Sequence, residues 1–140
     1  MIFPHVNWLA IIAAAVVIFL LGGLWYSPAL FAKRWVALQG RTMDQMKADS
    51  ANANMPMMYL QVFLCGLVTS WIMALFLAHL GRYGWMIGAH VGALAWLGFA
   101  APASYGTALF SMKPKQLWFI DTMFNLVSFV LAGALLGAWV

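Results

Sequence analysis

Polar residues inside the long apolar segments are the side chains of this chain that could carry chemistry. Asp121 is the only acidic residue in these segments, and Asn125 follows it by one helical turn, on the same face. A weaker stripe of the same spacing, Gln61, Cys65 and Thr69, lies in another segment. A carboxylate in an apolar medium is costly unless it is partnered, and such residues often bind a proton, an ion or a substrate. We therefore expect both stripes to face inward.

Three further polar side chains lie at a depth similar to that of Asp121 in other segments: Gln61, Tyr105 and Tyr26. A helical bundle can bring them together with Asp121 and Asn125 into one polar cluster. Two interpretations stay open. In the first, this candidate intramembrane cluster handles a proton or a small substrate. In the second, it only joins helices through hydrogen bonds, and the helix dipole or a nearby lysine stabilises Asp121.

The three histidines, His5, His79 and His90, are weak candidates for metal ligands. All three are expected near the same end of the molecule, but none is paired at the His-x3-His spacing that a helical metal site uses. The chain also lacks a Ser/His/Asp set in a recognisable context, a phosphate-binding glycine-rich loop, a CxxC pair and an HExxH motif. We therefore expect no metal, no cofactor and no enzymatic activity.

The composition places the chain in a membrane. Of its 140 residues, 66% are hydrophobic and only 7% are charged. Water-soluble domains carry roughly a quarter charged residues, and disordered chains carry more polar residues still. The length is that of one domain.

Crossing about 30 Å of hydrocarbon takes about 20 helical residues. Four segments meet this requirement, and each is too long and too evenly apolar for the strands of a barrel. The predicted fold class is an all-α integral membrane protein, with four transmembrane helices in a compact bundle that forms a single domain over residues 1–140. The predicted spans are residues 6–26, 57–80, 85–110 and 117–140.

The connector 27–56 is the one sizeable polar segment. A capping hydroxyl at Ser27 and a proline at Pro28 predict the start of a short helix, which Gly40 should end. A capping-box pattern at Thr42 predicts a second short, polar helix before the next span.

The first of these helices should lie on the inner leaflet of the membrane. Phe31 and Trp35 share one side of it at helical spacing and should dip into the lipid, while Lys33 and Arg34 should meet anionic lipid headgroups. Aromatic residues near the predicted span ends should form interfacial belts. They are Trp8, Trp25, Tyr26, Trp35, Tyr83, Trp85, Trp118 and Trp139.

The cations predict how the chain is threaded. Six of the seven Lys and Arg residues lie in connectors 27–56 and 111–116, and only Arg82 lies on the other side. Positive residues favour the cytoplasm, so we expect both connectors on the cytoplasmic side of the cell membrane and both termini on the outer side. The net charge is +4, and the cations flank apolar segments. This position favours anionic lipid headgroups over nucleic acid as partners.

Small residues predict where helices approach closely. Gly88 and Gly92 in the third span, and Gly133 and Gly137 in the fourth, each form a small-xxx-small face. Pro102 interrupts the third span and removes a backbone hydrogen bond, which predicts a kink or hinge.

Several stretches together resemble one family. "NWLA", "GLWYSPALFAKRW", "WLGFAAP" and "LWFIDTMFNLVS" are similar to the family named domain of unknown function 1761, small membrane proteins with about four spans. Ala32 stands where that family usually has glycine and Asn125 where it often has histidine, which argues against an Asp–His proton relay. The resemblance implies a fold and a membrane location, and no activity. The residues of the family-like motif are Asn7, Trp8, Trp25, Tyr26, Ser27, Pro28, Phe31, Lys33 and Trp35.

Three functions fit these observations. The first is a non-enzymatic structural, accessory or interaction subunit, with a second copy or another membrane protein as partner. The alternative is an oligomeric proton-linked or small-substrate transporter that uses Asp121. The third is a membrane enzyme that acts on a lipid or quinone-like substrate, with His90 or Asp121 as acid or base.

Overall fold

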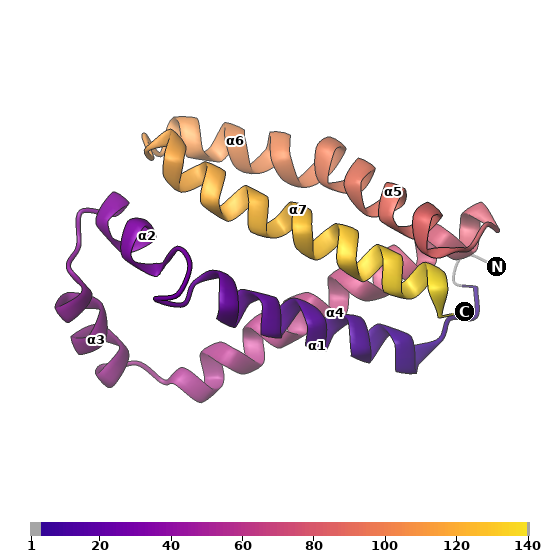
Figure 1. The fold of residues 1–140 in the computed structure, drawn as a ribbon, viewed down its shortest axis with the longest axis horizontal. Coiled ribbons are helices and arrows are strands. Elements are labelled where there is room, and N and C mark those ends of the chain that lie inside the picture. The colour runs from indigo at the N-terminus through magenta and orange to yellow at the C-terminus, as the bar shows by residue number, and fades with distance from the viewer. Residues whose placement is uncertain (1–3, 140) are drawn as a thin grey trace.

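Residues 4–139, which the computed structural model describes, fold into helices and turns without strands. The helices vary from short ones of 7 and 10 residues in the connector to long rods in the bundle (Figure 1). In chain order they are α1 (Trp8–Trp25), α2 (Ala32–Leu38), α3 (Met43–Asn52), α4 (Met55–Leu80), α5 (Trp85–Ala95), the π-helix η1 (Trp96–Ala100), α6 (Ala101–Phe110) and α7 (Lys115–Ala138).

Four long helices correspond to the four predicted spans. α1, α4, α7 and the continuous helix made by α5, η1 and α6 are each long and apolar enough to cross a membrane. Asparagine caps set two of their starts: Asn7 Oδ1 accepts a hydrogen bond from the Ala10 amide at 3.2 Å, and Asn54 Oδ1 accepts one from the Met57 amide at 3.3 Å. The predicted fold class, an all-α membrane bundle, is confirmed.

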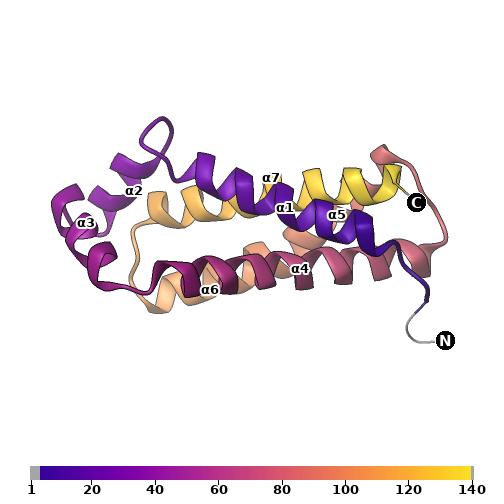
Figure 2. The ribbon, with the colours of Figure 1, turned by 90° about the horizontal axis from the view of Figure 1, so that it is seen from below.

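The two ends of the bundle differ. Figures 1 and 2 show both ends of the chain together at one end, whereas the connector with α2 and α3 lies at the other. α7 packs mainly against α5 and also against α1, which in turn packs against α4. The buried core lies between α1, α4 and α7 and consists of Ala10, Ile11, Ala14, Met73, Ala74, Leu77, Ala132 and Leu136.

Glycines let α5 and α7 approach backbone to backbone. A Cβ atom added at Gly88 would lie 1.8 Å from the carbonyl oxygen of Gly133, and one added at Gly92 would meet the Phe129 carbonyl at 2.1 Å. The Gly84 amide donates a hydrogen bond to the Gly137 carbonyl at 2.8 Å across the same interface. The predicted small-residue faces are confirmed, and van der Waals contact and polar backbone atoms both stabilise the helix pair.

The third span accommodates Pro102 through a π turn. η1 ends at Ala100, two residues before the proline, and the Ala101 amide donates to the carbonyl of Trp96, five residues back. A widened turn re-pairs backbone groups that a proline leaves without their usual partners. The π turn η1 thus marks the place where Pro102 interrupts the regular α-helix, and the kink or hinge stays a prediction.

The start of α2 differs from the prediction. Ser27 and Pro28 lie in a tight turn, and α2 begins only at Ala32. The Ser27 hydroxyl donates to the Leu24 carbonyl at 2.7 Å, so it closes the end of α1 and does not cap a new helix. The Phe31 amide donates back to the last residue of α1, which holds residues 27–31 as a turn.

The rest of the connector follows its local signals. Gly40, with φ of +72°, ends α2 in the left-handed conformation that glycine adopts readily. Thr42 and Gln45 form the predicted capping box at the start of α3, with both reciprocal hydrogen bonds present. Arg41 and Asp49 form an ion pair beside this helix.

The glycine contact predicts a position-specific loss of stability. Gly88→Ala places a methyl group against the Gly133 backbone, which cannot yield without separating α5 from α7, so we expect a loss of about 1–3 kcal/mol. Unfolding of the purified protein in detergent measures it. Gly98→Ala in the same span has no atom within 4 Å and is the matched control. Equal stability of the two variants would contradict the packing argument.

Candidate functional site

The Asp121 side chain accepts two hydrogen bonds from residues that are distant in the sequence. The Tyr26 hydroxyl donates to its Oδ1 atom at 2.6 Å, and the Trp35 indole Nε1 donates to the same oxygen at 3.0 Å. The Trp25 indole adds a third bond, to the Ile120 carbonyl at 3.0 Å. We call these five residues the Asp121 clasp. It fastens the end of α1 and the start of α2 to the first turns of α7.

Aromatic packing orients the donors of the clasp. The Tyr26 ring stands edge-on to Trp35 at 5.2 Å between ring centres and to Phe124 at 5.5 Å. The Trp25 ring lies 4.8 Å from that of Phe31, at the end of the turn. Such contacts fix the rings, so the polar atoms need little ordering when they bind the carboxyl group.

The turn between α1 and α2 brings these donors to the same place. α1 ends at Trp25 and the chain reverses through residues 27–31, so Trp35 in the first turn of α2 returns to the level of Tyr26. An uninterrupted helix from Pro28 would carry Trp35 away from it. The unexpected turn is thus the local structure that builds the clasp.

The Asp121 carboxyl group has no cationic partner within 4 Å among the described residues. In residues 4–139 the ion pair between Arg41 and Asp49 is the one within 4 Å, so neither Lys113 nor Lys115 neutralises Asp121. Asp121 lies roughly two turns inside α7, beyond the first turn in which the helix dipole is strongest. A half-buried carboxyl group is therefore satisfied by a phenol and an indole.

A crevice of about 360 Å³ opens between α6 and α7 beside the clasp. Asp121 and Asn125 both line it, so the carboxyl group borders the clasp on one side and a polar cavity on the other. Asp121 Oδ1 takes both donors, and in the described chain Oδ2 accepts no hydrogen bond. The complete lining is Ala103, Ser104, Thr107, Ala108, Lys113, Trp118, Asp121, Thr122 and Asn125.

Two hydroxyl groups of the crevice, those of Ser104 and Thr107, donate to carbonyl groups of their own helix. The Ser104 hydroxyl donates to the Ala100 carbonyl at 2.7 Å and accepts from the Trp118 indole at 3.0 Å. Tyr105 stacks on Trp118 with 4.7 Å between ring centres. These bonds hold the crevice wall in one arrangement.

The structure joins part of the predicted polar cluster. Tyr26 and Asp121 are hydrogen-bonded, Asn125 borders the same crevice, and Tyr105 reaches it only through its stacking on Trp118. Gln61 does not join them: it is exposed on α4 and, in residues 4–139, forms no hydrogen bond with the other four. The side of α4 that carries Gln61 and Cys65 faces outward, because α4 packs against the core with its opposite side.

Sequence reasoning missed Trp25 and Trp35 as members of the site. Both were assigned to the interface, and Trp35 to the lipid, yet each indole N–H donates to α7. A half-buried indole N–H requires an acceptor. Two tryptophans and a tyrosine close to the end of a span, in a chain with one intramembrane carboxyl group, were the available signal.

The remaining candidates lie apart from the clasp. Lys33 and Arg34 are exposed on α2, and Arg34 also donates to Gln116 at the start of α7. His90 is exposed and its Nδ1 lies 2.7 Å from the Met86 carbonyl of its own helix, while His79 lies in the last turn of α4. Residues 4–139 contain no group of three His, Cys, Asp or Glu side chains suited to a metal ion.

The clasp predicts that the two donors, Tyr26 and Trp35, hold the connector in place. Combining Tyr26→Phe with Trp35→Phe keeps an aromatic ring at each position, a smaller one at residue 35, and removes both hydrogen bonds to Asp121, each worth about 0.5–3 kcal/mol. We expect faster amide hydrogen exchange throughout α2, measured by mass spectrometry in detergent. Tyr59→Phe, on the exposed face of α4, is the control for loss of a hydroxyl. Unchanged exchange in α2 would show that the clasp does not hold the connector.

Comparison with known proteins identifies the family. The chain matches no curated protein and no solved structure. The family described as protein of unknown function (DUF1761) matches residues 9–137, which include both halves of the clasp. The chain therefore belongs to the DUF1761 family.

Proposed function

We propose that this protein is a non-enzymatic membrane subunit that acts by holding its connector in place and by binding another membrane helix. The observation that carries the proposal is the clasp: the one intramembrane carboxyl group binds Tyr26 and Trp35 of the same chain. A group used in this way stabilises a scaffold. The same scaffold presents α3, which buries none of its residues, beyond the end of the bundle (Figure 1).

A polar stripe on α4 supports a membrane partner. Gln61 and Cys65 are both exposed and lie one turn apart on the same side of α4. An amide facing lipid has no hydrogen-bond partner there, whereas a second helix can supply one. The partner we propose is a second copy of the chain, because two identical stripes that meet about a two-fold axis satisfy both amides.

The cations support an orientation for this subunit. Both connectors lie at the same end of the bundle and carry six of the seven Lys and Arg residues. We propose that this end faces the cytoplasm of a cell membrane, with both chain ends outside, and that Lys33 on α2 binds anionic headgroups.

The proposed dimer has a direct test, because Cys65 is the only cysteine. Mild oxidation of isolated membranes should produce a disulfide-linked dimer at Cys65, and Gln61→Leu should reduce its yield several-fold. The matched control is Leu131→Cys combined with Cys65→Ser, which moves the thiol to an exposed position on α7. Absence of a Cys65 dimer, or equal yields from the two positions, would refute the α4 contact.

The crevice favours a second candidate, a proton-linked or small-substrate carrier. Asp121 and Asn125 both border a cavity of about 360 Å³ near the connector end, and Asp121 Oδ2 accepts no hydrogen bond within the described chain. A carboxyl group that borders a cavity and has one oxygen free of hydrogen bonds can bind and release a proton there.

Proton flux separates the two candidates. In vesicles that contain the purified protein and a pH-sensitive dye, a carrier produces pH-dependent flux that Asp121→Asn abolishes. Tyr26→Phe is the matched control, because it loosens the clasp but keeps the carboxyl group. We expect the wild-type protein to show no flux above that of empty vesicles. Flux that Tyr26→Phe retains and Asp121→Asn loses would establish the carrier instead.

A further inference from the structure

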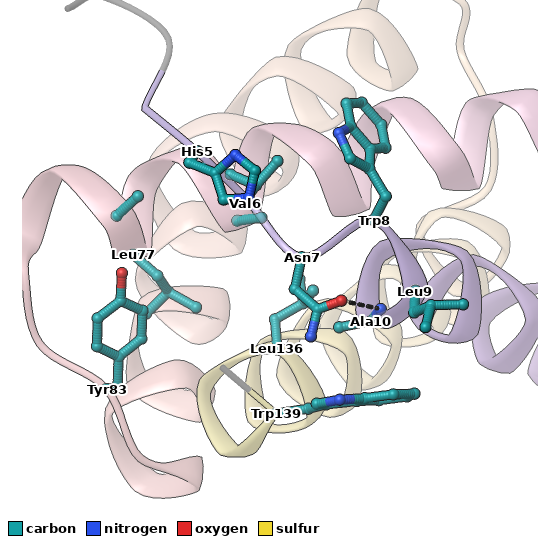
Figure 3. Close-up of a pocket in the computed structure, with 12 residues that line it drawn as sticks. His5, Val6, Asn7, Trp8, Leu9, Ala10, Leu77, Tyr83, Leu136 and Trp139 are labelled. Atoms are coloured by element: carbon teal, nitrogen blue, oxygen red, sulfur yellow. Dashed lines mark hydrogen bonds between the residues drawn. The ribbon is translucent and has the colours of Figure 1, made fainter.

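A second, larger cavity lies at the opposite end of the bundle, where the residues just before α1 lie near the end of α7 (Figure 3). Its volume is about 520 Å³, within the range of small-molecule sites. Ala10, Leu77 and Leu136 form its base, and all three belong to the buried core. The packed helices α1, α4 and α7 therefore support the cavity.

Hydrogen-bond donors gather around this cavity. Asn7 Oδ1 is occupied by the Ala10 amide, so the free group of its side chain is the NH₂ donor, which Figure 3 shows turned toward the side of Leu136 and Trp139. The Tyr83 hydroxyl and the Trp139 indole add two further donors. In residues 4–139 no hydrogen bond engages either of these two side-chain groups.

Among residues 4–139, no acidic side chain lines the cavity, and His5 supplies its one imidazole. The three acidic residues of the chain, Asp44, Asp49 and Asp121, lie in the connector or near the start of α7, at the other end. No Lys or Arg lines the cavity either. Phosphate groups are usually bound by Arg or Lys, and cations by carboxylates. A neutral acceptor is the ligand group that these donors match.

Aromatic walls define the rest of the ligand. Trp8 and Trp139 line the cavity, and Trp8 is held by stacking on Trp71 with 6.4 Å between ring centres. Flat walls of this kind bind a planar ring, and the apolar base accepts a hydrocarbon substituent. We propose that this cavity binds a neutral quinoid amphiphile, a planar ring with carbonyl acceptors and an apolar tail. This binding is independent of the clasp and of the proposed subunit function.

Asn7→Asp tests the proposal without removing the helix cap. Aspartate caps a helix as well as asparagine, but it replaces the NH₂ donor by an acceptor that repels a carbonyl oxygen. Decyl-benzoquinone, added to the full-length protein in lipid nanodiscs, should quench tryptophan fluorescence saturably. We expect about tenfold weaker binding in Asn7→Asp and a several-fold loss in Tyr83→Phe.

Asn54→Asp is the matched control, because Asn54 caps α4 in the same way but lies outside the cavity. It should bind the quinone as the wild-type protein does. Absence of saturable quenching in the wild-type protein, or equal binding by Asn7→Asp and Asn54→Asp, would overturn the proposal. Displacement of the quinone by phosphatidylglycerol at equimolar concentration would also overturn it, since the site would then be one for an anionic headgroup.

Discussion

A carboxyl group placed in an apolar helix without a counter-charge must find hydrogen-bond donors, and much of this structure follows from that requirement. Asp121 finds them 95 and 86 residues earlier in the chain, in Tyr26 and Trp35. Binding both donors to one oxygen fixes where α1 ends and where α2 begins. The connector is therefore held against the bundle by the same interaction that makes the carboxyl group tolerable there.

α7 is the helix on which both ends of the bundle depend. Near its start it presents Asp121 to the connector, and near its end Gly133 and Gly137 allow the backbone of α5 to approach. The two contacts differ in chemistry. A polar group needs a specific hydrogen-bond partner, whereas a glycine face needs only a neighbouring helix without large side chains at the contact. Together they leave α7 little freedom to rotate, and one cavity lies near each end of this helix.

The family-like motif acquires a physical role from this arrangement. Trp25, Tyr26 and Trp35 supply the donors, and Ser27 closes the end of α1, so the motif forms a turn that fastens to α7. The matched region, residues 9–137, includes Asp121 and the part of the motif from Trp25 to Trp35, whereas Asn7 and Trp8 lie just before it. Asn7, at the other end of α1, combines a helix cap with the edge of a cavity. Asn7 and Tyr26, two polar residues of the motif, thus lie at opposite ends of α1.

The sequence by itself determined the four long helices, the caps at Thr42 and Gly40, and the glycine faces, because hydrophobic length and capping are local properties of the chain. Tertiary structure decided which polar groups meet. Gln61 faces outward and Trp35 faces inward, although both are polar or amphipathic residues near the same end of the bundle. The difference depends on how each helix is rotated about its axis, and packing between distant segments sets that rotation.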